Sequence, residues 1–285
     1  MSTGPSPAMT AGTTFVALVA FAANSVLCRM ALLEGNIDAA SFTVVRIVSG
    51  AVTLAILVAL RNPGQLVVRP NWAAGAALFT YMVLFCLAYI TLGAGSGALV
   101  LFGFVQLTMM SMALLQKEPF PPLAWLGLAV AVAGVIYLVR PGSEAPDAIA
   151  ALQMAGAGVA WGAYSVIGRG SKNPLQDTAS NFLLCVPFAL ILMALFWQDQ
   201  VLTTKGLGLA IASGALASGC GYAIWFKTLP HLTTAQASIL QLSVPIIASV
   251  GGVMFLAETI SSRLVIASVL VLGGIALVLR SRMRR

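Results

Sequence analysis

Charged side chains are scarce in this sequence. Asp, Glu, Lys and Arg make up only 8% of its 285 residues, against about 25% in a typical soluble domain. Hydrophobic residues make up 60%, and the mean hydropathy is +0.98. A soluble fold of this length has too little interior to bury so many apolar side chains. The composition excludes a soluble globular domain, a disordered chain and a coiled coil, and the long apolar runs predict an all-α polytopic membrane protein rather than a β-barrel.

Residues that carry metal or catalytic chemistry are also scarce. The four cysteines, Cys28, Cys86, Cys185 and Cys220, form no CxxC motif and no cluster with the single histidine, so neither a disulfide framework nor a metal site is predicted. The chain has no HExxH, GxSxG or Walker A motif. We therefore predict no enzymatic activity and no cofactor. The net charge of +7 is interpreted as basic residues at span ends, since no basic stripe with interleaved aromatics indicates nucleic-acid binding.

Apolar segments long enough to cross a bilayer, which takes about 20 residues each, recur along the whole chain. The predicted spans are residues 13–32, 41–60, 73–92, 97–115, 123–139, 148–168, 180–197, 207–226, 233–256 and 264–280. With a cytoplasmic N-terminus, the inner loops and tail carry ten Lys and Arg residues and the outer loops carry four. The positive-inside rule therefore predicts that both termini lie in the cytoplasm, on the inner side of a cell (inner or plasma) membrane.

The two halves of the sequence match each other at a constant offset of 140 residues. The matched pairs include Arg29 and Arg169, Phe42 and Phe182, Glu118 and Glu258, Gly134 and Gly274, and Arg140 and Arg280. Five spans per half is an odd number, so the second half enters the membrane from the opposite side. The sequence thus predicts two inverted five-helix repeats, residues 1–140 and 141–285, with a substrate site near the midplane where they meet.

A glutamate closes the fourth span of each half, in residues 115–118 and 255–258. Ten spans arranged in this way resemble the drug/metabolite transporter (DMT) superfamily, EamA type, and within it the chain looks most similar to the YddG-type amino-acid exporters. The resemblance implies ten helices around a central cavity that faces one side at a time. It also implies export of amino acids and related metabolites, with aromatic amino acids as candidates.

Polar and aromatic side chains near the middle of the spans are the candidate substrate contacts, because such residues are expensive at membrane depth unless they have a partner or a cavity. They are Asn24, Ser25, Tyr81, Gln106, Trp161, Tyr164, Ser165, Tyr222 and Gln241. Trp161 lies deep, not at the interface where membrane tryptophans collect. Its ring is a candidate either to pack against an apolar substrate or to fill the core. Pro245 removes one helical hydrogen bond and is the predicted hinge.

Charged residues at or near span ends receive structural interpretations. Arg46, about five residues into its span, is predicted to snorkel outward or to pair with Glu34 or Asp38, in preference to binding a substrate carboxylate. Glu118 and Glu258 are expected to make capping or loop contacts.

Several alternatives remain open on the sequence alone. No carboxylate lies in the middle of any span, which disfavours proton-coupled antiport of cationic drugs and favours facilitated transport or exchange of neutral or zwitterionic solutes. A carrier of sugar phosphates or nucleotide sugars would need several deep Lys or Arg residues, and only Arg46 is available. A channel or a non-transporting scaffold is the alternative from another class. The expected partners are a small-molecule substrate and the lipid bilayer, and the chain is expected to be a monomer.

Overall fold

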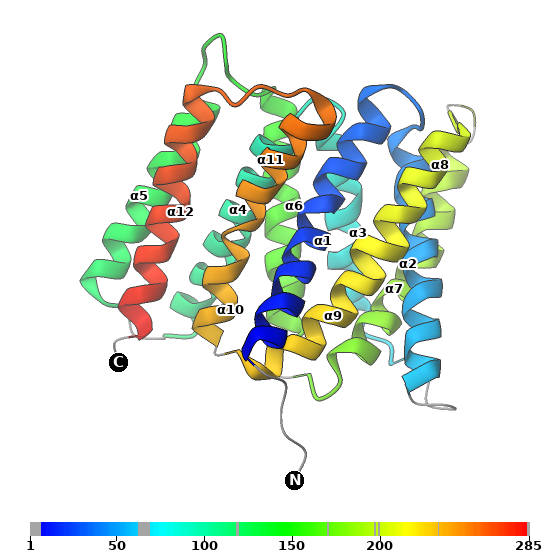
Figure 1. Ribbon diagram of the computed structural model, residues 1–285, viewed down its shortest axis with the longest axis horizontal. Helices are drawn as coiled ribbons and strands as arrows, with labels where there is room; N and C mark the ends of the chain where they lie inside the picture. The colour runs from blue at the N-terminus through cyan, green and yellow to red at the C-terminus, as the bar shows by residue number, and fades with distance from the viewer. Residues whose placement is uncertain are drawn as a thin grey trace.

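The computed structural model describes residues 7–61, 69–117, 120–169, 171–196, 198, 200–232 and 234–283. These residues form a bundle of helices that run side by side (Figure 1). Within the described residues, nine helices are long and apolar enough to cross a membrane, and α3 is a shorter apolar helix of 17 residues. The predicted fold class, an all-α polytopic membrane protein, is confirmed.

The described helices follow the predicted spans closely. They are α1 (Pro7–Leu33), α2 (Ala39–Arg61), α3 (Trp72–Ala88), α4 (Ala94–Leu115), α5 (Pro122–Val139), α6 (Ala148–Ile167), α7 (Pro174–Leu195), α8 (Thr204–Ile211), η2 (Ala212–Cys220), α9 (Gly221–Thr228), η3 (Leu229–His231), α10 (Thr234–Gln241), α11 (Val244–Leu256) and α12 (Ser262–Met283). Two predicted spans are composite. Residues 207–226 fall in α8, η2 and α9, and residues 233–256 fall in α10 and α11.

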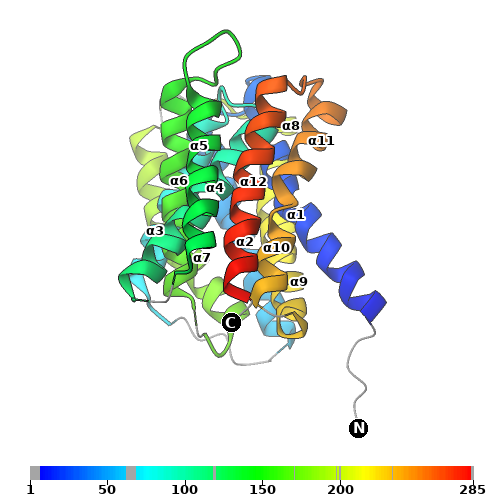
Figure 2. The same cartoon turned by 90° about the vertical axis from the view of Figure 1, so that its left-hand side faces the viewer.

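The start of α1 and the end of α12 lie at the same end of the bundle, as Figures 1 and 2 show. The loop from α5 to α6 and the loop from α11 to α12 lie at the opposite end. The two ends of the bundle are therefore distinguishable without reference to a membrane, and the second of them carries the pocket described below.

Side-chain caps explain where several helices begin. Asn71, Asp147, Asn173 and Thr203 each precede a helix and accept a hydrogen bond from a backbone N–H in its first turn. The caps satisfy donors that a helix leaves unpaired at its N-terminus. The polar residues between apolar runs thus set the boundaries of α3, α6, α7 and α8.

Glycines bring several helix backbones into direct contact. A Cβ on Gly127 of α5 would lie 2.6 Å from the carbonyl oxygen of Gly274 of α12, and a Cβ on Gly274 would lie 2.5 Å from that of Gly127. A Cβ on Gly158 of α6 would lie 2.7 Å from the carbonyl oxygen of Leu101 of α4. Small residues commonly permit such close approach between membrane helices. The contact between α4 and α6 holds in place the part of α6 that carries Trp161.

A π-helical segment, η2, interrupts the span formed by α8 and α9, and no feature of the sequence predicted it. Its Ser213 and Ser218 both donate hydrogen bonds to the Asn24 side-chain oxygen of α1, at 2.8 and 3.3 Å. These bonds between helices stabilise a local geometry that a regular α-helix would not provide. Segments of this kind occur frequently at functional sites.

The predicted helix over residues 233–256 is broken. A turn at Leu242 and Ser243 separates α10 from α11, and Pro245 lies in the first turn of α11. Proline is tolerated there, because a first-turn N–H has no intrahelical partner. The prediction of one continuous span over residues 233–256 is wrong in this respect, because the first helix ends after Gln241. By contrast, Pro187 lies inside α7, which continues through it.

Candidate functional site

Five aromatic side chains gather at the centre of the bundle, and we call them the aromatic cluster. They are Tyr81, Phe85, Trp161, Tyr164 and Tyr222. Trp161 is central: its ring centroid lies 4.8 Å from that of Tyr81, 5.3 Å from Tyr164 and 5.6 Å from Tyr222, with which it stacks. Such ring pairs contribute about 0.5–1.5 kcal/mol each beyond the burial of their area.

The cluster draws on both halves of the chain. Tyr81 and Phe85 lie in α3, whereas Trp161 and Tyr164 lie in α6 and Tyr222 in α9. Helix α3 packs against α6, and α9 packs against α1 and α7. Four of the five members are among the predicted site residues. Phe85 is not, since a phenylalanine within an apolar helix carries no signal in the sequence that separates it from core packing.

Arg46 of α2 lies against this cluster and is fully buried. Its Nη2 donates a hydrogen bond to the Tyr81 hydroxyl oxygen at 3.2 Å. The guanidinium carbon lies 4.8 Å from the Phe85 ring centroid and 5.5 Å from that of Tyr81, within the range of cation–π attraction. The prediction that Arg46 snorkels outward is therefore wrong.

The predicted carboxylate partners of Arg46 are engaged elsewhere. Glu34 forms an exposed ion pair with Lys205. Asp38 accepts hydrogen bonds from the backbone N–H groups of Ser41 and Val201. The prediction of a pair with Glu34 or Asp38 is wrong, because both lie before the start of α2 and are held by the first turns of α8 and α2 and by the segment before α8.

Five of the predicted site residues lie outside the aromatic cluster: Asn24, Ser25, Gln106, Ser165 and Gln241. Asn24 joins α1 to η2, as described above, and Ser25 is buried on α1. Gln106 is buried in α4. The Ser165 hydroxyl donates to the carbonyl oxygen of Trp161 in its own helix, at 2.8 Å. Gln241 is partly buried and ends α10 at the break before α11.

Two polar residues of α7 support the cluster and were not singled out. Asn181 donates its side-chain N–H to the Tyr164 hydroxyl at 3.3 Å, and the Tyr164 hydroxyl lies 3.5 Å from that of Thr178. Both α7 residues are buried. They could not be singled out from the sequence, because polar residues are common near the start of a span and do not by themselves indicate a site.

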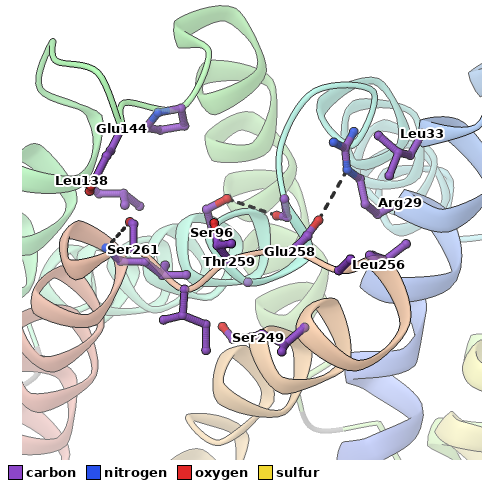
Figure 3. Close-up of a pocket in the computed structure, with 17 residues that line it drawn as sticks. Arg29, Leu33, Ser96, Leu138, Glu144, Ser249, Leu256, Glu258, Thr259 and Ser261 are labelled. Carbon is purple, nitrogen blue, oxygen red and sulfur yellow. Dashed lines mark hydrogen bonds and ion pairs between the residues drawn. The ribbon is translucent and has the colours of Figure 1, made fainter.

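A pocket of about 450 Å³ opens at the end of the bundle opposite the termini. Figure 3 shows Glu258 between Arg29, of α1, and the start of α4. The Glu258 carboxylate accepts hydrogen bonds from the backbone N–H of Ala94 at 2.9 and 3.1 Å and lies 3.6 Å from Arg29 Nε. Arg29 Nη1 also donates to the carbonyl oxygen of Ile90 at 2.6 Å. We call Glu258, Arg29 and Ala94 the Glu258 clamp.

The clamp confirms the expectation of a capping role for Glu258. Its carboxylate satisfies the first N–H of α4, where the helix dipole also favours negative charge. The equivalent residue of the first half, Glu118, lies outside the described residues.

The pKa of the Glu258 carboxyl is raised above its ordinary value. Burial is the largest cause, because it disfavours the charged form, while the Ala94 N–H and Arg29 act in the opposite direction and reduce the rise. A raised pKa in the folded state means that the folded protein binds the proton more tightly than the unfolded chain. The stability that Glu258 contributes is therefore fully present at pH values below the ordinary pKa of glutamate, about 4.3. It is lost as the pH rises through the raised pKa.

The direction of this pH dependence predicts a result for Glu258→Gln. Glutamine mimics the protonated carboxyl group and keeps an acceptor for the Ala94 backbone N–H. As the pH is raised from mildly acidic to neutral, the melting temperature of the wild type should fall relative to that of Glu258→Gln. The measurement is thermal unfolding of both proteins in detergent over a pH series. A difference that stays constant with pH, or that moves in favour of the wild type, would contradict the expectation.

Comparison with known proteins adds to this geometry. A model described as the EamA-like transporter family matches residues 148–280. The chain is 46% identical over 272 residues to the uncharacterized protein PA1977 of Pseudomonas aeruginosa, with 95% of each chain covered. It is 27% identical over 259 residues to the uncharacterized transporter YwfM of Bacillus subtilis, covering 87% of this chain and 86% of the relative. A solved structure, described as a crystal structure of protein, matches with a TM-score of 0.64 at 20% identity, covering 92% of this chain and 95% of that one. That last likeness bears on the fold alone.

Proposed function

We propose, on the premise that this chain belongs to the EamA-like transporter family, that it exports amino acids and related metabolites across the cell membrane by alternating access. Aromatic amino acids are the leading substrates, as for the YddG-type exporters that the sequence resembles. The chain works as a monomer, with both termini in the cytoplasm, so the Glu258 clamp closes the outer end.

The observation that carries this proposal is the aromatic cluster. Trp161 packs against Tyr81 and Tyr222, and the three rings come from helices of both halves. A substrate ring placed among them would gain apolar contact and ring stacking. Relative movement of the halves would change these contacts, which couples the site to the transport cycle. Since one chain supplies all of these residues, a monomer contains the complete site.

The packing of the helices supports the inverted repeat. Helix α5 packs against α12, α2 against α7, and α4 against α11. Each pair joins a helix to its counterpart about 140 residues later in the chain. Equivalent helices contact each other in this way when they lie on either side of an axis of approximate two-fold symmetry. The same arrangement gives the carrier two related halves that can rock about the shared centre.

Replacing Trp161 by alanine is expected to raise the KM for L-phenylalanine about thirtyfold. The substrate would lose about 2 kcal/mol of apolar and ring contact, and each 1.4 kcal/mol is a factor of ten. The measurement is counterflow of labelled phenylalanine into proteoliposomes that contain the purified chain.

Trp125→Ala is the matched control, because the Trp125 side chain of α5 is 52% exposed on the outside of the bundle. It should leave KM unchanged. Saturable counterflow in the wild type separates a carrier from a channel. An unchanged KM in Trp161→Ala would remove the aromatic cluster from the substrate site, and the absence of saturable counterflow for every amino acid tested would contradict amino-acid export.

A further inference from the structure

Arg46 is the one described cation buried within the centre of the bundle. It is the eighth residue of α2, about 10 Å along the helix from its start at a rise of 1.5 Å per residue. Its side chain has no exposed surface. Ionisable residues inside membrane proteins are expensive, and they typically mark substrate or ion pathways.

The guanidinium of Arg46 is incompletely satisfied. Its Nη2 donates to the Tyr81 hydroxyl, but its Nε and Nη1 have no hydrogen-bond partner among the described residues. The Cys86 side chain is a further hydrogen-bond partner of Arg46, and the rings of Phe85 and Tyr222 lie within reach of its charge. Within the described residues, the two ion pairs involve other side chains, so none of the described carboxylates balances Arg46.

A second buried arginine shows what a structural role looks like in the same bundle. Arg263 of α12 donates from Nη1 to the carbonyl oxygens of Leu138 and Arg140, at 3.3 and 2.6 Å. It therefore ties α12 to the end of α5. Arg46 makes no such bond to the end of another helix in the described part of the chain. The contrast makes helix capping a poor explanation for Arg46.

We propose that Arg46 binds the carboxylate of the transported substrate. Nε carries one N–H group and Nη1 carries two, and guanidinium–carboxylate hydrogen bonds are short and strong because both partners are charged. The aromatic cluster lies directly beside the guanidinium, through Tyr81 and Phe85. A molecule that joins a carboxylate to an apolar or aromatic body fits both parts at once. The assignment rests on the proposed transport function, whose site it extends.

The distribution of charge around Arg46 also indicates which group of the substrate the site does not recognise. All the described carboxylates lie in loops or in the first turn of α7, away from Arg46. The described part of the centre therefore offers no anionic partner for the amino group of a substrate. Recognition should depend on the carboxylate and the ring, and it should tolerate loss of the amino group.

The experiment measures thermal stabilisation of the purified full-length protein in detergent by four compounds. L-phenylalanine and 3-phenylpropionate carry the carboxylate, whereas L-phenylalaninamide and phenethylamine lack it. The wild type should be stabilised by the first two and at least tenfold less effectively by the other two. Arg46→Met should lose the preference, with apparent affinity for 3-phenylpropionate at least tenfold weaker, and Arg46→Lys should retain part of it.

Arg263→Met is the matched control, since it removes a buried guanidinium whose hydrogen bonds in the described residues go to backbone carbonyls. It should lower the melting temperature and keep the preference for carboxylates. If Arg46→Met does not fold, the comparison of Arg46→Lys with the wild type carries the test.

The outcomes separate this inference from the proposed function. A wild type that responds equally to phenethylamine and 3-phenylpropionate, or a carboxylate preference that survives in Arg46→Met, would overturn the role of Arg46. Counterflow of phenylalanine would still support amino-acid export in that case. Absence of counterflow for every amino acid, with stabilisation by 3-phenylpropionate that depends on Arg46, would reject amino-acid export and support the carboxylate site.

Discussion

Gly274→Ala is expected to destabilise the protein strongly, although it adds a single methyl group. The new Cβ would lie 2.5 Å from the carbonyl oxygen of Gly127 and 2.6 Å from the backbone nitrogen of Ala131. Both are backbone atoms, which cannot rotate away, so α5 and α12 must separate. Overpacking of this kind costs about 1–3 kcal/mol, and at about 2–4 °C per kcal/mol for a large chain the melting temperature should fall by about 2–12 °C.

The neighbouring residue provides the control. A Cβ on Gly273 meets no atom within 4 Å, and alanine is a better helix former than glycine by about 1 kcal/mol. Gly273→Ala should therefore leave the melting temperature unchanged or raise it. The comparison requires only thermal unfolding of the two variants in one detergent. Equal melting temperatures would show that α5 and α12 do not pack backbone to backbone.

Glu258→Ala is expected to open the end of the bundle opposite the termini. The substitution leaves Arg29 without its ion pair and the buried N–H of Ala94 without an acceptor. Hydrogen bonds to charged groups contribute about 1.5–3 kcal/mol, so the closed arrangement should become at least about tenfold less populated relative to an open one. In the proposed cycle, this shift favours the conformation that faces outward.

A cysteine placed at Ser96, which lines the pocket beside Glu258 (Figure 3), reports this change. In a background that lacks the half-buried Cys220, a membrane-impermeant maleimide should label Ser96→Cys about tenfold faster when Glu258 is alanine. Glu258→Gln should label at nearly the wild-type rate, because the amide oxygen still accepts from Ala94.

Glu34→Ala is the control for loss of an ion pair. The pair between Glu34 and Lys205 is about half exposed, and exposed pairs contribute about 0–1 kcal/mol. It should not alter the labelling rate. Equal labelling of the wild type and Glu258→Ala would show that the clamp does not hold this end closed.

The positions of the membrane spans could be predicted from the sequence because the bilayer imposes a local rule. Length and apolarity of each segment are sufficient to place a helix, and the described helices overlap all the predicted spans. Four members of the aromatic cluster could be found for a related reason, since tyrosine and tryptophan are unusual at membrane depth. Glu258 could be placed at a helix end because it follows the apolar segment of a predicted span almost directly in the sequence.

Features that depend on packing between helices could not be predicted. The π-helical segment is stabilised by Asn24, which is 189 residues away from Ser213 in the chain. Arg46 was assigned to carboxylates close to it in sequence, whereas its hydrogen-bond and cation–π partners Tyr81 and Phe85 lie on α3, at least 35 residues later. The hydropathy of a segment carries no information on which neighbouring helix supplies a partner.

The short length of α3 has a consequence for the lipid around the protein. Its 17 residues span about 25 Å at 1.5 Å per residue, against a hydrocarbon thickness of about 30 Å. Trp72 at its start is 57% exposed and suits the headgroup boundary. A span shorter than the bilayer is accommodated by local thinning of the bilayer or by snorkelling of flanking side chains, so lipids with shorter acyl chains should meet this side of the protein with less elastic strain than lipids with longer ones.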